Sequence, residues 1–230
     1  MKKVFMSRFC PNINKIVKPT IALFLYDPKC SVQSGNGMMK ALSEYYNFKI
    51  FSKNKLEYDF FDNVDMIAVP GGIGDSDTFK QLFKNNGKRV KDFIHNGGRY
   101  LGICMGAYWA GSYYLDVLDE VDAVQYIKRP DTDTRRPHAK NLEITWKDEP
   151  MNMFFYDGCA LVGNRHKFKT IATYANGDPM AIYQKRIGLI GCHPESEQFW
   201  YDSYSYMKGK WHKGVQHELL LDFTNDLMKR

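Results

Sequence analysis

One segment, Gly102–Ala110 (GICMGAYWA), restricts the possible folds of this chain more than any other. It places Cys104 between two glycines, after the strand-like residues 99–101 and before a run that can be helical. A residue on a sharp turn from strand to helix has a strained backbone, and its neighbours two positions away must be small. Gly102 and Gly106 meet this requirement. The segment therefore predicts a nucleophile elbow in an α/β fold, with a thiol in place of the serine hydroxyl.

A second motif, His-Pro-Glu at residues 193–195, follows the apolar residues 187–190 and can supply a base. The proline disfavours helix at His193, so this segment should be extended. Residues two apart in an extended chain share a face, so Glu195 can hold the His193 imidazole while the ring faces Cys104. A histidinium and a helix N-terminus would favour the thiolate form of the cysteine. We predict Cys104 as nucleophile, His193 as general base and acid, and Glu195 as the group that orients it.

A third motif, Pro70-Gly71-Gly72, ends the buried, strand-like run 64–69. Glycines here let the backbone approach a substrate carbonyl, so the N–H groups of Gly72 and Met105 are candidates for an oxyanion hole. The three motifs each follow a predicted strand. Because ligands bind at the carboxyl ends of the strands in open α/β sheets, we expect the motifs to meet at one edge.

The rest of the chain alternates between predicted strands and helices. The apolar run 20–26 is typical of a strand buried on both faces. Residues 27–37 are polar and contain glycine, which predicts a loop before a helix over 38–46. This alternation predicts a doubly wound, mainly parallel sheet with helices on both faces and a short antiparallel extension. Further strands are predicted at 48–52, 121–127, 142–146, 168–174 and 180–183, and further helices at 90–95, 105–115 and 216–228.

Length and composition narrow the class of protein. Residues 1–19 are interpreted as an N-terminal extension and residues 20–230 as a single domain. The net charge of +6 is dispersed and no nucleic-acid-binding motif accompanies it, so a nucleic-acid partner is not expected. No apolar run approaches the ~20 residues that span a bilayer. Five cysteines without a C-x-x-C pair favour a reducing compartment, and we expect a cytoplasmic protein.

The neighbouring residues Cys192 and His193 are of types that bind zinc. Adjacent side chains on a strand point to opposite faces, so we expect a buried structural cysteine and no metal. The aromatic residues between 199 and 211 are expected to pack around a C-terminal helix, with a wall of the substrate pocket as the alternative.

The three motifs resemble those of the class I glutamine amidotransferase superfamily. Within it, residues 102–112 (GICMGAYWAGS), 155–158 (FYDG) and 191–195 (GCHPE) are similar to the domain at the N-terminus of eukaryotic biotin–protein ligases. The resemblance covers residues 20–200. It implies a flavodoxin-like fold, a Cys104-His193-Glu195 triad that acts through a thioester intermediate, and no cofactor.

One departure from that family concerns the substrate. Glutamine-hydrolysing members usually carry a glutamine shortly after the elbow glycine, where this chain has Ala107-Tyr108-Trp109. We therefore expect a small-molecule or peptide amide, or a related carbonyl compound, without assigning glutamine. Gly71, Tyr108, Tyr156 and Asp157 are the expected substrate-binding residues, although Tyr156 and Asp157 fit a plain turn equally well.

The alternative function is a non-catalytic binding or regulatory domain that keeps the amidotransferase-like pocket, as in the N-terminal region of biotin–protein ligases. The chain shows no adenylate-binding run, so biotin transfer is not expected. Either function is compatible with a homo-oligomer or with a partner subunit.

Overall fold

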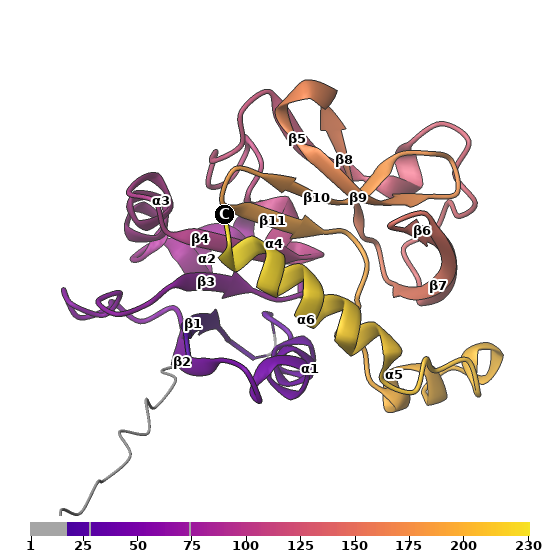
Figure 1. The fold of residues 1–230 in the computed structure, drawn as a ribbon, viewed down its shortest axis with the longest axis horizontal. Coiled ribbons are helices and arrows are strands. Elements are labelled where there is room, and N and C mark those ends of the chain that lie inside the picture. The colour runs from indigo at the N-terminus through magenta and orange to yellow at the C-terminus, as the bar shows by residue number, and fades with distance from the viewer. Residues whose placement is uncertain (1–17, 28, 74) are drawn as a thin grey trace, which may run out of the picture.

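The computed structural model describes residues 18–27, 29–73 and 75–230. The predicted extension over residues 1–19 therefore lies almost wholly outside the described residues, as does Cys10. Figure 1 shows one large sheet crossed by helices on both sides, with the last helix running back across the sheet. No helix among the described residues has the length and apolar character needed to cross a membrane.

Five neighbouring parallel strands form one half of the nine-stranded sheet. They confirm the predicted strands near residues 20, 48, 64, 99 and 187. In sheet order they are β2 (Asn47–Phe51), β1 (Thr20–Phe24), β3 (Met66–Val69), β4 (Arg99–Ile103) and β11 (Ile187–Ile190).

The two faces of the sheet carry separate hydrophobic cores. Ile21 and Leu23 of β1 point into one core, and Ala22 and Phe24 point into the other, as the two-residue period of a strand requires. Helices cover both faces, which confirms the predicted doubly wound class (Figure 1). One face carries α1 (Val32–Leu42) and α6 (Val215–Met228); the other carries α2 (Ser76–Phe83), α3 (Gly87–His95) and α4 (Met105–Trp109).

The other half of the sheet is antiparallel and more extensive than the short extension expected. Strand β7 (Glu149–Phe155) was not predicted, because its sequence EPMNMFF contains proline and asparagine, which are rare in strands. It forms the sheet edge, where proline is tolerated. The order continues with β10 (Pro179–Gln184), β9 (Lys169–Tyr174), β6 (Lys140–Trp146) and β7 (Glu149–Phe155), while β5 (Val121–Gln125) and β8 (Cys159–Gly163) pair separately.

The loop predicted over residues 27–37 is wrong beyond residue 31, because α1 begins at Val32. Glycines weaken a helix, and this segment contains two of them at positions 35 and 37. Tertiary packing overrides that preference, since a Cβ at Gly35 would overlap the Leu25 side chain. The helix is capped by Ser31, whose hydroxyl accepts the Ser34 N–H at 3.2 Å.

The helix predicted over residues 105–115 is also shorter, because α4 ends at Trp109. The side chain of Asp122 accepts hydrogen bonds from both the N–H and the hydroxyl of Ser112, which draws the chain out of the helix toward β5.

The remaining short elements are α5 (Gln198–Asp202) and the 3₁₀ turns η1 (Tyr126–Lys128), η2 (Arg165–Lys167) and η3 (Ser205–Met207).

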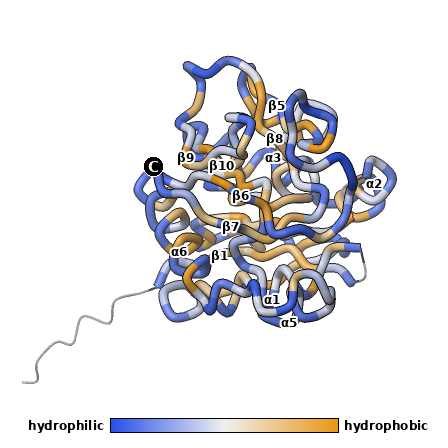
Figure 2. The backbone as a smooth tube through the Cα atoms, turned by 90° about the vertical axis from the view of Figure 1, so that its right-hand side faces the viewer, coloured by the Kyte–Doolittle hydropathy of each residue, from blue (hydrophilic) through white to orange (hydrophobic). Residues whose placement is uncertain are grey.

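The hydropathy of the backbone follows these layers. Figure 2 shows hydrophobic strands through the interior, with hydrophilic segments mainly around the outside. The parallel strands β3, β4 and β11 are almost entirely buried along their lengths. The residues that follow them are therefore positioned by a rigid core.

Candidate active site

The structure brings the three sequence motifs together at one edge of the sheet. Strands β3, β4 and β11 are direct neighbours, so their carboxyl ends lie side by side. Two backbone hydrogen bonds tie the segments that follow them: Cys104 N–H donates to Ile190 O at 2.8 Å, and Gly106 N–H donates to Pro70 O at 3.2 Å.

Cys104 has the strained backbone expected of an elbow. Its φ of 47° and ψ of −102° are rarely adopted by a residue with a side chain. Its side chain is buried, with Sγ 3.7 Å from the Tyr156 carbonyl oxygen. The neighbouring glycines are required here, because a Cβ on Gly102 would meet the Gly106 carbonyl and a Cβ on Gly106 would meet the Val69 carbonyl.

His193 is buried and paired with a fully buried carboxylate. Its Nδ1 lies 2.8 Å from Oε1 of Glu195, which leaves Nε2 available to Cys104. Burial by itself lowers the pKa of His193, but its interactions with Glu195 and with the Cys104 side chain outweigh burial and raise that pKa to about 10. Glu197 is not the partner of His193, since its carboxylate pairs with Lys40.

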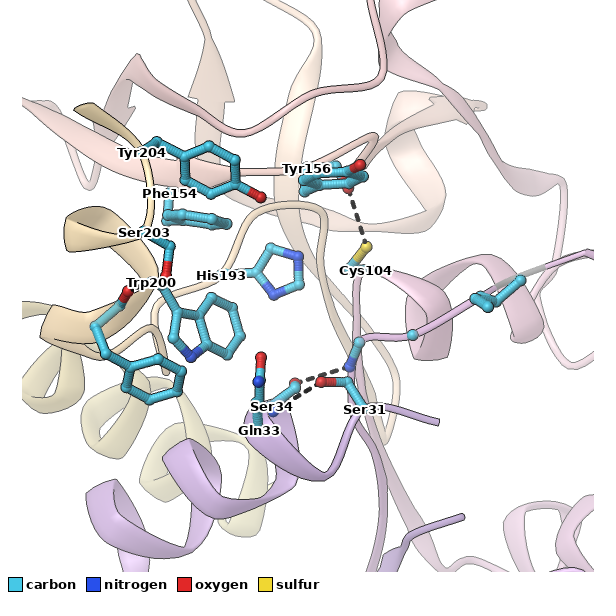
Figure 3. A pocket seen from close by; sticks show the side chains of 14 residues that line it. Ser31, Gln33, Ser34, Cys104, Phe154, Tyr156, His193, Trp200, Ser203 and Tyr204 are labelled. Atoms are coloured by element: carbon cyan, nitrogen blue, oxygen red, sulfur yellow. Dashed lines mark hydrogen bonds between the residues drawn. The ribbon is translucent and has the colours of Figure 1, made fainter. Parts of the chain in front are cut away.

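Ser34 is a site residue that the sequence did not reveal. Its hydroxyl donates to Oε1 of Glu195 at 2.6 Å and accepts the Gly71 N–H at 2.9 Å, and the side chain is fully buried. Figure 3 shows it beside Ser31, below His193. It lies in the segment predicted as a loop, and the pair of serines at a helix start was the only available signal.

The glycine turn after β3 is held close to this group. A Cβ on Gly71 would lie 2.6 Å from Cε1 of His193, so only glycine allows the imidazole its position. The turn is fixed by hydrogen bonds from Ser31 N–H to Gly71 O at 3.0 Å and from Ile73 N–H to Lys29 O at 2.8 Å. Among the described residues, the N–H groups of Gly72 and Met105 have no acceptor within the chain.

Two cavities meet at Cys104, and both are lined by Cys104, Gly72, Ile73 and Tyr156. The smaller, which we call the His193 pocket, has a volume of about 370 Å³ and is drawn in Figure 3. The larger, which we call the Tyr108 pocket, has a volume of about 850 Å³. The His193 pocket also contains Phe154, Phe199, Trp200 and Tyr204, and the Tyr108 pocket also contains Asp75, Gln125, Lys128, Arg129 and Asp157.

The expected substrate-binding residues Tyr108 and Asp157 come together in the Tyr108 pocket. Tyr108 Oη donates to the Asp157 carbonyl at 3.1 Å, and Gln125 Nε2 donates to the Asp157 carboxylate at 3.1 Å. Burial raises the pKa of the Asp157 carboxyl, while Gln125 and Lys128 oppose that rise. Asp157 has a φ of 52°, which agrees with the turn interpretation of this segment. The pairing of β5 with β8, which brings Gln125 here, was not predicted.

The aromatic residues after His-Pro-Glu divide into two groups. Phe199, Trp200 and Tyr204 line the His193 pocket, as the alternative interpretation of the sequence required. Tyr201 and Met207 pack in a small hydrophobic core that also includes Trp200.

No metal centre is apparent in the part of the chain that the structure describes, where no three His, Cys, Asp or Glu side chains are arranged to hold an ion. Cys192 is fully buried, with Sγ 3.8 Å from Tyr174 Oη, in keeping with a structural cysteine.

Comparison with known proteins identifies similar sequences and folds. Residues 28–118 match the family described as biotin-protein ligase, N terminal, a span that contains Gly72 and Cys104 but not His193. No curated protein matches the chain in sequence.

Several solved structures share the fold. PurLQS from Thermotoga maritima matches with a TM-score of 0.60 at 12% identity, over 92% of this chain and 100% of that one. A glutamine amidotransferase from Thermotoga maritima matches with a TM-score of 0.56 at 13% identity, over 93% of both chains. A glutamine amidotransferase from Methylobacillus flagellatus matches with a TM-score of 0.58 at 10% identity, over 93% of both chains. The family match over residues 28–118 agrees with the resemblance to the biotin–protein ligase N-terminal domain that the motifs predicted, and the solved structures show that the chain shares its fold with glutamine amidotransferases.

Proposed function

We propose that this chain is a cysteine-dependent hydrolase or amidotransferase-like enzyme that attacks an amide or related carbonyl. The observation that carries the proposal is the arrangement around Cys104. A strained elbow presents the thiol at a cavity beside His193, whose other ring nitrogen is held by the buried Glu195. Nucleophile, base and orienting carboxylate are the parts that covalent catalysis requires.

The proposed reaction begins with the Cys104 thiolate and the His193 imidazolium. The sulfur forms a bond to the carbonyl carbon, and the carbonyl electrons move onto oxygen, which accepts the N–H groups of Gly72 and Met105. Nε2 of His193 then gives its proton to the leaving nitrogen as the C–N bond breaks, which leaves a thioester on Cys104. Water or another acceptor attacks the thioester, His193 takes the acceptor's proton, and the thiolate is released.

The raised pKa of His193 supports this scheme, because it keeps the imidazole protonated and ready to act as an acid at neutral pH. Ser34 also supports this scheme, because it gives the Glu195 carboxylate a second hydrogen bond. We also propose that the enzyme acts with a second copy or a partner subunit, since a chain of PurLQS shares its fold.

One observation favours the alternative of a binding or regulatory domain. Tyr108 stands where glutamine-hydrolysing relatives usually carry glutamine, and its hydroxyl is already bonded to Asp157. A pocket that binds a ligand without turnover would not need a reactive thiol, so the two functions differ in the chemistry of Cys104.

The test is the rate of Cys104 alkylation by iodoacetamide between pH 5 and 9, located by mass spectrometry. We expect fast alkylation down to acidic pH, and a fall of about tenfold or more at pH 7 in His193→Ala, because an ordinary thiol is only a few per cent ionised there.

The exposed His166→Ala serves as the matched control and should leave the profile unchanged. The buried Cys30, Cys159 and Cys192 are internal references in the same digest. If Cys104 reacts as slowly as these residues, or with the same profile in His193→Ala, the catalytic proposal is wrong and the binding domain is favoured.

A further inference from the structure

The two pockets at Cys104 are chemically unlike, and only one of them contains the acid. His193 lines the smaller pocket and is absent from the larger one. In the proposed reaction the leaving group must take its proton from His193 as its bond to the carbonyl carbon breaks. The leaving group therefore lies in the His193 pocket, and the acyl group extends into the Tyr108 pocket.

The size of the His193 pocket does not suit ammonia. Ligand pockets in proteins typically measure about 300–1,000 Å³, and this one measures about 370 Å³. Hydrolysis of a primary amide such as glutamine would leave most of that space unused. The pocket fits a leaving group of one or two rings.

The walls of the pocket define its chemistry. Rings stand edge to face around it: Phe154 and Trp200 have centroids 5.2 Å apart, and Trp200 and His193 have centroids 5.4 Å apart. In Figure 3 His193 lies between Cys104 on one side and Trp200 with Phe154 on the other. The described residues that line it include no Asp, Glu, Lys or Arg. A cationic leaving group would be desolvated there without a partner, and the His193 imidazolium is already paired with Glu195.

The Tyr108 pocket differs because it has charged groups beside its tyrosines. Asp75, Lys128, Arg129 and Asp157 all border it, although Arg129 is already paired with Asp178 at 2.8 Å. A polar or charged acyl group can be held there by these charged side chains.

We infer that the His193 pocket takes an uncharged aromatic leaving group, so that the substrate is an aryl amide or aryl ester with a polar acyl part. This inference rests on the proposed function and specifies its substrate class. In the acylation step the bond from carbonyl carbon to the aryl nitrogen or oxygen breaks, His193 supplies the proton, and a neutral arylamine or phenol remains in the pocket.

The experiment compares two alkylating reagents, iodoacetamide and iodoacetanilide, which differ by one phenyl ring on the nitrogen. In each case the sulfur of Cys104 bonds to the methylene carbon and iodide leaves. The rate with iodoacetanilide is divided by the rate with iodoacetamide at Cys104. This ratio is then divided by the same ratio for glutathione, which corrects for the intrinsic reactivity of the two reagents. We expect the anilide to be preferred about tenfold, because the contacts of its ring with two aromatic side chains of the pocket would stabilise its binding by that factor.

Phe199→Ala removes a wall of the pocket and should reduce the preference several-fold. Phe199 is 47% exposed, so its loss should not unfold the protein. Tyr58→Ala, at a side chain that is 98% exposed and remote from both pockets, should keep the preference.

If Cys104 is reactive toward both reagents but shows no preference, the inference is overturned and the proposed function stands. An inert Cys104 overturns the proposed function, and the inference falls with it. A preference that survives in Phe199→Ala and in Trp200→Ala also contradicts the assignment of the ring to this pocket.

Discussion

Individual residues at the candidate site are linked through Ser34. Its single hydroxyl joins the glycine turn at Gly71 to the carboxylate of Glu195, which lies 161 positions after Ser34 in the sequence. Oε2 of Glu195 has no hydrogen-bond partner among the described residues, so the Ser34 and His193 bonds to Oε1 are the ones that hold this buried carboxylate. We therefore propose that Ser34 is a positioning residue, which acts on His193 through Glu195.

We predict that Ser34→Ala slows alkylation of Cys104 about tenfold at neutral pH and moves the acid limb of the pH profile to higher pH. A hydrogen bond to a charged carboxylate favours the charged form, so its loss weakens the pairing with His193. The free energy of unfolding should fall by about 1–3 kcal/mol, because Gly71 N–H is left buried without its acceptor. Urea unfolding and the alkylation profile measure the two effects.

The matched control for this substitution is Thr224→Val in α6, which also removes a fully buried hydroxyl, one bonded to Leu220 O at 2.7 Å. It should cost about 1 kcal/mol and leave the alkylation profile unchanged. A Ser34→Ala protein that is destabilised but keeps the normal profile would show that the serine has only a structural role.

At the scale of helices and strands, an element could be predicted where the sequence pattern that specifies it lies within its own segment. The residues Gly72, Cys104 and His193 each follow an apolar run within their own segment, so strand and site were predictable together. The first part of helix α1, residues 32–37, was not, because its glycines serve contacts with distant segments. Strand β7 was hidden by residues that only an edge position tolerates. The His193 pocket is lined by residues of both α1 and α5, so its lining could not be predicted from the sequence.

Helix α1 also packs tightly against the Glu195 segment at Gly37, where a Cβ would overlap the Glu195 carbonyl oxygen. We predict that Gly37→Ala destabilises the protein by about 1–3 kcal/mol, because the helix must move off the Glu195 segment. Alkylation of Cys104 should slow in parallel, since Ser34 moves with the helix. Unfolding in urea and the alkylation rate at pH 7 measure the two effects.

Gly87→Ala is the control for this helix substitution. A Cβ there meets only the Phe83 side chain at 3.6 Å, so the change should be neutral or stabilising by up to about 1 kcal/mol. If Gly37→Ala were as well tolerated as Gly87→Ala, α1 would not be held against the site as described.

At the scale of the whole molecule, the C-terminal segment contacts Ser196, the residue that follows Glu195. His212 and His217 both approach the Ser196 carbonyl through Nε2, at 3.0 and 3.1 Å. Nδ1 of His212 accepts the N–H groups of Gly214 and Gln216, so the neutral ring carries its proton on Nε2. A second proton would have to bind Nδ1, where it would face the N–H groups of Gly214 and Gln216. Burial lowers the pKa of His212 to about 4, and His217 adds to that fall.

The two buried histidines predict a stability maximum near pH 6.5. His193 binds its proton more tightly when folded, so its contribution is complete below 6.5 and is lost as pH rises toward about 10. His212 binds its proton more weakly when folded, so stability is lost as pH falls from 6.5 toward about 4. Urea unfolding midpoints between pH 4 and 10 should fall on both sides of the maximum. His193→Gln should flatten the alkaline side and His212→Gln the acid side, whereas His95→Gln, at an exposed position, should change neither. An acid slope that persists unchanged in His212→Gln would mean that carboxylates, not this ring, couple the C-terminal segment to pH.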